Sequence, residues 1–171
     1  MKTKRFIIIA LFAALISVAT IIIPPIPIFS IPVTLQTLMI MITGLLLKPR
    51  DAFLAVLLYL ILGVIGIPVF SGFNSGLSAI LGPTGGFLLA FPFASLLISY
   101  FKGNMSFWRL LIINFIFASL MVYLVGAASI AIVNEVNYFN VLKTLLVFIP
   151  IDFVKSIIAA LVGIKLKHIS Y

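Results

Sequence analysis

Residues 6–47, FIIIALFAALISVATIIIPPIPIFSIPVTLQTLMIMITGLLL, decide the fold because they contain no Asp, Glu, Lys or Arg. One membrane crossing needs about 20 apolar residues, so this charge-free stretch of 42 residues is long enough for two. Proline breaks a helix interior, and four prolines fall between residues 24 and 32, at Pro24, Pro25, Pro27 and Pro32. The stretch therefore predicts two transmembrane helices joined by a short connection.

Two more charge-free stretches follow, at residues 52–101 and 110–134. Their lengths predict two crossings and one crossing, with glycines and prolines between 66 and 86 separating the first two. A last crossing is predicted after Pro150, a residue that suits the first turn of a helix. The predicted helices span residues 5–23, 33–47, 52–66, 86–101, 107–131 and 150–167, with an amphipathic segment near 138–148.

The overall composition agrees with an all-α integral membrane protein of six transmembrane helices. Hydrophobic residues make up 64% of the chain and charged residues 8%, against about 25% charged in soluble proteins. This composition excludes a soluble globular protein and a disordered one, and it excludes nucleic-acid binding despite a net charge of +8. The 171 residues are within the length of one domain, so we expect residues 1–171 to form a single membrane-embedded domain.

The basic residues predict the orientation of the chain in the membrane. If the N-terminus is inside, nine of the eleven Lys and Arg residues fall on the cytoplasmic side: Lys2, Lys4, Arg5, Lys48, Arg50, Lys102, Arg109, Lys165 and Lys167. Loops on the cytoplasmic side of membrane proteins are enriched in Lys and Arg. We therefore expect a multi-pass protein of the cell (plasma) membrane with both termini in the cytoplasm.

Few residues have side chains suited to catalysis or to binding a metal or cofactor. There is no cysteine, the one histidine is His168 in a basic tail, and no Gly-Lys dipeptide exists to form a phosphate-binding Walker loop. Enzymes need an acid–base pair or a metal cluster, and the chain offers only Asp152 with Lys155. The sequence therefore predicts neither an enzyme nor a metal or cofactor site. The acidic Asp51 is at a predicted helix start, where a carboxylate favours the helix dipole.

Asp152 and Lys155 lie three residues apart in the opening of the last predicted helix, on one helix face. A lone charge at membrane depth costs about 2.5–3.5 kcal/mol on the insertion scale, and ionisable groups there commonly mark ligand sites. An opposite charge nearby lowers that cost. Two interpretations therefore remain open at this point, a structural ion pair and a binding site.

Two other polar groups precede helices. The connection at 71–76 and the segment 82–86 are rich in glycine, whose free backbone N–H groups suit an anionic or carbonyl-bearing ligand, although a flexible loop would have the same composition. Thr34, Gln36 and Thr37 either bind a ligand or bond to a neighbouring helix.

All these groups lie toward the outer face in the predicted topology, which favours one externally facing pocket. Aromatic residues between them would supply apolar walls of the kind that line small-molecule sites. The predicted wall residues are Phe29, Phe70, Phe73, Phe87 and Tyr138.

Four motifs in order closely resemble the BioY family, the biotin-binding substrate components of energy-coupling-factor (ECF) transporters. They are PVTLQTL at 32–38, GVIGIPVF at 63–70, GPTGG at 82–86 and PIDFVK at 150–155, and the likeness covers nearly the whole chain. One departure is Ile151, where members of the family usually have Gly before the Asp. We expect this change to alter local packing rather than to remove a ligand contact.

The resemblance implies the six-helix fold of an ECF substrate (S) component that takes up biotin with high affinity from an outward-facing pocket. The implied partners are a transmembrane coupling subunit and two cytosolic ATPase subunits, which would supply the ATP-driven step. Two alternatives remain: a substrate component for another small vitamin, and a membrane enzyme or a carrier that needs no ATPase module.

The ligand chemistry and the resemblance together suggest site residues. Asn74 and Asp152 are assigned to the ureido head of biotin, while Lys155 would keep Asp152 ionised and donate to the ligand. Further candidates are Gln36, Thr34, Thr84, Gly85 and Gly86, the last two offering backbone N–H groups to the carboxylate.

The resemblance also implies that Ala10 and Ala14 on the first helix dock on the coupling subunit. Small residues at this spacing permit close helix approach in lipid. A contact within the chain would explain the same pattern.

Overall fold

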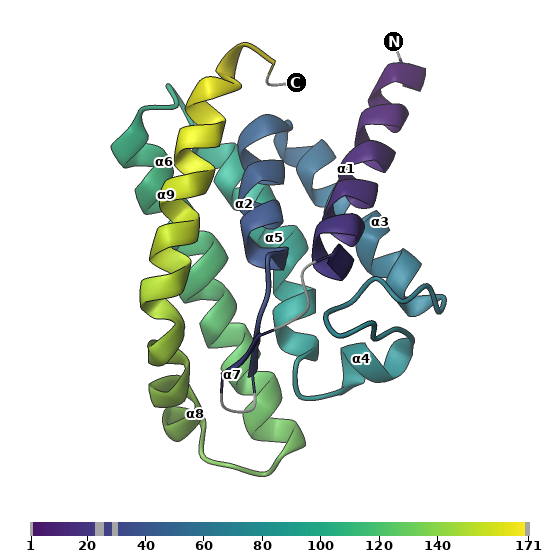
Figure 1. Cartoon of the computed structure of the whole chain (residues 1–171), viewed down its shortest axis with the longest axis vertical. Coiled ribbons are helices and arrows are strands. Elements are labelled where there is room, and N and C mark those ends of the chain that lie inside the picture. Colours follow the sequence, from purple (N-terminus) through teal and green to yellow (C-terminus); the bar gives the residue numbers. More distant parts are fainter. Residues whose placement is uncertain (1, 23–25, 29–30, 170–171) are drawn as a thin grey trace.

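The computed structural model describes residues 2–22, 26–28 and 31–169 as helices joined by short connections, with one small antiparallel hairpin (Figure 1). The α-helices are α1 Lys2–Ile22, α2 Gln36–Leu46, α3 Pro49–Val64, α4 Leu77–Leu81, α5 Gly85–Phe101, α6 Phe107–Asn114, α7 Met121–Val133, α8 Tyr138–Leu145 and α9 Ile149–Lys165. A π-helical segment, Phe115–Leu120, joins α6 to α7, and a 3₁₀ turn, Leu146–Phe148, joins α8 to α9. The remaining elements are strands β1 Ile26–Ile28 and β2 Ile31–Val33 and the 3₁₀ turn Lys167–Ile169.

The six predicted helices are present in the predicted order, with ends displaced by a few residues. Among the described residues, three helical runs are by length and composition long and apolar enough to cross a membrane: Thr3–Ile22, Phe107–Val133 and Tyr138–Lys165. Helices α2, α3 and α5 have 11, 16 and 17 residues, fewer than the 20 or so of a full crossing. Tilt or local thinning of the bilayer accommodates short spans, so the structure is compatible with six crossings. The predicted amphipathic segment is α8, and it runs on into α9.

The connection after α1 contains a hairpin where the prolines predicted only a helix break. Strands β1 and β2 pair antiparallel, with Ile26 opposite Val33 and Ile28 opposite Ile31. β-Branched residues favour extended backbone, and proline excludes a helix. Pro24 and Pro25 lie outside the described residues. Helix α4, in the connection between α3 and α5, was also not predicted.

Close packing at small residues holds the helices together. Helix α5 lies at the centre and packs against α2, α3 and α7, while α9 packs against α2 and α6, and α1 against α3. A Cβ atom added to Gly44 of α2 would lie 2.8 Å from Ile98 and from the Ser95 carbonyl oxygen on α5. Only glycine permits this approach, as is common where helices meet in lipid.

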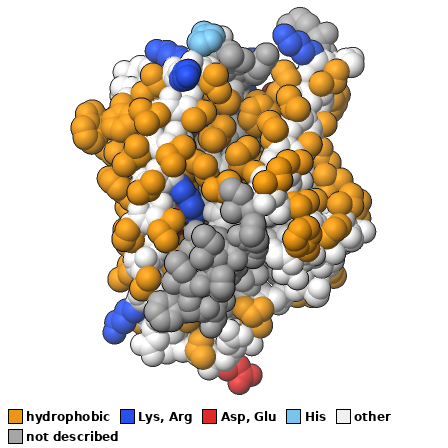
Figure 2. Space-filling view, in the orientation of Figure 1, with side chains coloured by type: hydrophobic (Ala, Val, Ile, Leu, Met, Phe, Trp, Pro, Cys, Tyr) orange, Lys and Arg blue, Asp and Glu red, His pale blue; other side chains and the backbone are white. Residues whose placement is uncertain are grey.

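Both termini lie at one end of the molecule (Figure 1), where several Lys and Arg side chains gather above an apolar middle zone (Figure 2). Arg5 Nε donates to Asp51 Oδ1 at 2.6 Å, so α1 and α3 are joined by an ion pair. Asp51 is in the first turn of α3, as predicted, and its side chain accepts from Arg5. Lys102 Nζ donates to two carbonyl oxygens at the end of α2 at 2.8 Å. Burial, and to a lesser degree the charge of Lys48, lowers the pKa of Lys102 to about 8.

Candidate functional site

A cavity of about 410 Å³ lies in the half of the molecule away from the termini. Its walls are supplied by the starts of α2, α5, α7 and α9, by the end of α8 with the 3₁₀ turn after it, and by the 70–84 segment. Its polar lining residues are Thr34, Gln36, Thr37, Ser71, Asn74, Ser75, Ser78, Thr84, Tyr123, Asp152 and Lys155. Its apolar lining residues include Phe70, Phe87, Leu88, Phe91, Leu145 and Phe148. This volume is typical of small-molecule sites, which range over about 300–1,000 Å³.

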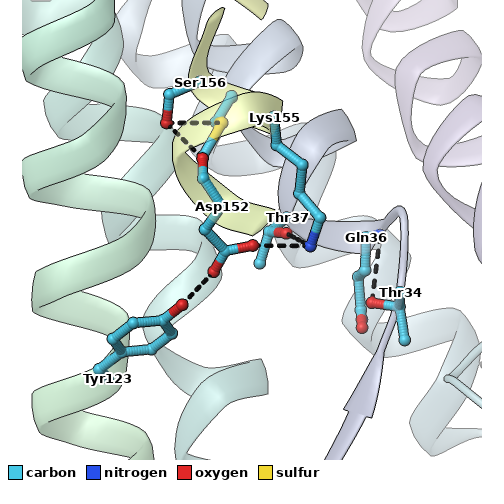
Figure 3. Close-up of polar contacts among 8 residues, drawn as sticks. Thr34, Gln36, Thr37, Tyr123, Asp152, Lys155 and Ser156 are labelled. Atoms are coloured by element: carbon cyan, nitrogen blue, oxygen red, sulfur yellow. Dashed lines mark hydrogen bonds and ion pairs between the residues drawn. The ribbon is translucent and has the colours of Figure 1, made fainter. Parts of the chain in front are cut away.

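The two charged residues of the lining form an ion pair at the start of α9. Lys155 Nζ lies 2.7 Å from Asp152 Oδ1 and also donates to Thr37 Oγ1 of α2 at 2.9 Å (Figure 3). Asp152 is 4% exposed and Lys155 8%. The i, i+3 spacing on α9 brings the two side chains together, as predicted. Because the pair is neutral as a whole, it offers a ligand both an acceptor and a donor without a net charge.

Tyr123 of α7 is a third member of this group, and the sequence reasoning missed it. Its hydroxyl donates to Asp152 Oδ2 and so meets the carboxylate oxygen that Lys155 does not bind (Figure 3). The backbone carbonyl of Asp152 accepts a hydrogen bond from Ser156 Oγ at 2.8 Å. Two side chains therefore hold the Asp152 carboxylate, one at each oxygen, while the Ser156 hydroxyl bonds to the backbone of α9.

Gln36 and Thr34 line the opposite part of the cavity, at the start of α2. Gln36 Nε2 donates to the Tyr59 hydroxyl at 2.6 Å, and that hydroxyl donates to the Val69 carbonyl at 3.1 Å. The Gln36 backbone N–H donates to Thr34 Oγ1 at 3.3 Å. These bonds hold α2 against α3 and the segment that follows it. Gln36 and Thr37 therefore bond to neighbouring helices and also line the cavity, so the two interpretations of this group are compatible.

Asn74 lines the cavity from a tight turn. The Phe70 backbone N–H donates to the Asn74 carbonyl at 3.0 Å, and Asn74 Nδ2 donates to the Ser71 carbonyl at 2.8 Å. Gly72 and Gly76 have positive φ angles of 74° and 85°, which glycine adopts without strain. The glycines therefore shape an internally bonded turn. Within the described part of the chain, the Asn74 side-chain oxygen and its second N–H have no hydrogen-bond partner and can bond to a ligand.

Thr84 lines the cavity, but Gly85 and Gly86 do not. A Cβ atom on Gly85 would overlap the carbonyl group of Ile80 in α4, and one on Gly86 would lie 2.6 Å from Ser129 Cβ of α7. In this structure both glycines allow α5 to approach its neighbours closely.

The predicted wall is correct in part. Phe70 and Phe87 line the cavity, Phe73 is 62% exposed and, with Tyr138, is not among the lining residues, and Phe29 lies outside the described residues. Phe91 and Phe148 were missed. Phe91 is four residues after Phe87 on α5, and this spacing, which puts two helical residues on one face, could have identified it.

The remaining predicted residues, Ala10 and Ala14, lie on α1 away from the cavity and are exposed. Ala13 between them is fully buried, so the two alanines are not the side of α1 that packs inside the molecule. Among the described residues, no group of three or more His, Cys, Asp or Glu side chains could hold a metal ion.

The whole sequence is similar to known proteins. Residues 1–170 match the BioY family. The chain is 42% identical to the biotin transporter BioY2 of Lactococcus lactis over 95% of its length and 88% of the relative. It is 36% identical to the probable biotin transporter BioY of Pyrococcus horikoshii, over 98% of both chains.

A solved structure, the S-component for biotin from an ECF-type ABC transporter, superposes with a TM-score of 0.90 at 33% identity. The superposition covers 98% of this chain and 92% of the other. These relatives are transporters and transporter components, which agrees with the prediction that the chain is not an enzyme. The match extends through nearly every residue and includes all four sequence motifs, so this chain is an integral membrane protein of the BioY family.

Proposed function

We propose that this chain, residues 1–171, is a single substrate-binding domain that binds biotin and acts as the S-component of an ECF-type ABC transporter. The observation that carries the proposal is the buried Asp152–Lys155 pair in the lining of the cavity, in a chain that resembles a biotin S-component along 98% of its length. Among the described lining residues, this pair supplies the only charges. Such a lining suits a ligand with a neutral polar head and an apolar body.

The chemistry of biotin fits these groups. The ureido head has two N–H donors and one carbonyl acceptor, so an Asp152 carboxylate oxygen accepts from one N–H and the Asn74 side-chain oxygen from the other. Lys155 has three N–H donors, of which Asp152 and Thr37 occupy two. The third is available for the ureido carbonyl. Gln36 and Thr34 are additional polar contacts on the α2 side.

The rest of the ligand would meet the other lining residues. The thiophane ring lies against the aromatic wall, where Phe87 and Phe91 face the cavity from α5. The carboxylate tail extends toward Thr84 and the backbone of Gly85 and Gly86 at the start of α5, where the helix dipole favours a negative charge. Gly85 and Gly86 do not line the cavity in this structure, so Thr84 is the residue placed to make the first contact.

We propose that the transport step requires partners: a transmembrane coupling subunit and two cytosolic ATPase subunits. The sequence contains no Gly-Lys dipeptide and hence no Walker loop for ATP. The exposed Ala10 and Ala14 face of α1 is the docking surface that we assign to the coupling subunit.

A competition titration distinguishes biotin from another small vitamin as the ligand. Purified protein should bind labelled biotin, and unlabelled biotin should displace it at far lower concentration than thiamine or riboflavin does. Stronger displacement by another vitamin would identify this chain as a substrate component of different specificity.

The proposed topology has both termini in the cytoplasm and an outward-facing cavity. Cysteines introduced one at a time at Asn104, between α5 and α6, and at Asn137, before α8, are the only thiols in the variants, since the chain has no cysteine. A membrane-impermeant thiol reagent should label the Asn137 variant from outside intact cells and the Asn104 variant only after the membrane is opened. Labelling of both from the same side would overturn the topology.

A substitution behind the aromatic wall should weaken binding without touching a polar residue. Gly126 of α7 packs against the Phe87 ring, so close that a Cβ atom would overlap it. The added side chain should push the Phe87 ring toward the cavity, and at the cost of about 1–3 kcal/mol that is typical of overpacking, Gly126→Val should weaken biotin binding by about fivefold or more. Val125→Leu, on the exposed side of the same helix, is the matched control and should bind like the parent. Equal affinity of both variants would show that Phe87 does not contact the ligand.

A further inference from the structure

The Tyr123 hydroxyl is the second side-chain donor to the Asp152 carboxylate. Tyr123 lines the cavity and is 6% exposed, and it donates to Oδ2 while Lys155 donates to Oδ1. Figure 3 shows the two donors approaching the carboxylate from opposite sides. Among the described residues, these are the two side chains that bond to its oxygens.

Hydrogen bonds to both oxygens of the Asp152 carboxylate restrict this group more than a bond to one oxygen does. A carboxylate held by Lys155 alone can rotate about the bond to its Cβ atom, because one hydrogen bond leaves that rotation free. The bond from Tyr123, which comes from another helix, fixes the plane of the group. It also occupies acceptor capacity on Oδ2, so Asp152 presents less than its full acceptor set to a ligand.

The helix that carries Tyr123 is irregular just before this residue. The π-helical segment Phe115–Leu120 interrupts the run Phe107–Val133 and ends three residues before Tyr123. A single π-bulge adds one residue to an α-helix, which turns the following residues by about 100° relative to an uninterrupted helix. Asn114 and Ser119, at this segment, are buried with side-chain atoms that have no partner among the described residues. The side chains of Asn114 and Ser119 therefore do not explain the irregularity by their own hydrogen bonds, and its consequence is the direction in which Tyr123 points.

We propose that Tyr123 is a positioning residue that sets the specificity of the site, an inference that rests on the proposed biotin function. By fixing Asp152 and occupying one of its oxygens, Tyr123 adapts the carboxylate to a single N–H of a neutral cyclic urea. A cyclic guanidinium binds a carboxylate best through two parallel N–H···O bonds, which require both oxygens. Lys155 adds a positive charge that disfavours such a cationic head. The site therefore selects the urea over the guanidinium through Tyr123.

The test compares biotin with 2-iminobiotin, whose head is a cyclic guanidinium, at neutral pH, where that head is protonated. The purified full-length protein and its Tyr123→Phe variant are titrated with both compounds. The variant should bind biotin about tenfold more weakly, because its Asp152 carboxylate is free to rotate and must be ordered when the ligand binds. It should bind 2-iminobiotin with a smaller loss or none, so that the preference for biotin falls by at least about threefold. An unchanged preference, whether or not both affinities fall, would make Tyr123 a packing residue and overturn the inference.

Two further variants complete the experiment. Tyr100→Phe removes an exposed hydroxyl at the far end of α5 and should leave both affinities unchanged. Tyr123→His keeps a ring N–H donor and should stay closer to the parent in its preference than Tyr123→Phe does. If the Tyr123→His protein binds biotin but has lost the preference for biotin over 2-iminobiotin, the inference fails. This outcome can be measured even if the Tyr123→Phe protein does not insert into the membrane. Failure of the parent protein to bind biotin would instead refute the proposed function itself, before any variant is compared.

Discussion

An Asp152→Ala variant is expected to bind biotin at least about 30-fold more weakly than the parent protein, the largest effect of any single substitution in the site. Asp152 and Lys155 are 2.7 Å apart and almost fully buried. Removing one member of a buried charge pair leaves the other unpaired, which costs about 2–5 kcal/mol of binding, and 2 kcal/mol corresponds to roughly 30-fold. Lys155→Ala should have an effect of similar size, measured by equilibrium titration of purified protein.

Asp51→Ala is the matched control for this experiment. Asp51 also forms an ion pair, with Arg5, but the pair lies outside the cavity and near the end that carries the termini. Its loss should leave biotin affinity unchanged. A folded, membrane-inserted Asp152→Ala protein that binds biotin like the parent would show that the Asp152–Lys155 pair is structural and that the site assignment is wrong.

The second large effect is expected at the surface of α1, in transport rather than in binding. Ala14→Trp places a bulky ring on the exposed face that Ala10 shares. If that face packs closely on the coupling subunit, the ring prevents the approach. A disrupted central contact costs an assembly about 2 kcal/mol or more, roughly 30-fold. Complex formation and biotin uptake should therefore fall, while the isolated variant binds biotin with the parent's affinity.

Ile132→Trp on α7 makes a similar change at another exposed position and should affect neither uptake nor binding. Co-purification of the subunits and uptake of labelled biotin measure the two effects separately. If biotin binding by the isolated Ala14→Trp protein falls as much as assembly does, the alanines support the internal structure of the chain and the docking surface is elsewhere.

The helices and the Asp152–Lys155 pair were accessible to sequence reasoning because both depend on local spacing. Charge-free lengths and proline positions locate the helices along the chain, and an i, i+3 spacing places two charges on one face whatever surrounds them. The hairpin at 26–28 and 31–33 was not accessible in this way. The strand sequences are Ile-Pro-Ile and Ile-Pro-Val. No Gly or Asn lies between them, so the usual sequence signature of a hairpin turn is absent, and the prolines indicated only the end of a helix.

Tyr123 could not be predicted because its direction depends on the π-helical segment before it. If Phe107–Val133 were one regular α-helix with 3.6 residues per turn, the Tyr123 side chain would point in another direction. Nothing in the sequence marks the π-helical segment. Gly85 and Gly86 illustrate a different limit. Glycines before a helix suit anion binding and close helix packing equally well, and only the positions of Ile80 and Ser129 show that both glycines lie in tight helix contacts here.

The most direct test of the account is the experimental structure of this protein with biotin bound. The ureido head should lie in the cavity with one N–H within about 2.7–3.2 Å of an Asp152 carboxylate oxygen and its carbonyl facing Lys155, and the carboxylate tail should point toward Thr84. Biotin bound in the reverse direction, with its carboxylate on Lys155 and its ureido head at Thr84, would contradict the account, as would biotin bound outside the cavity.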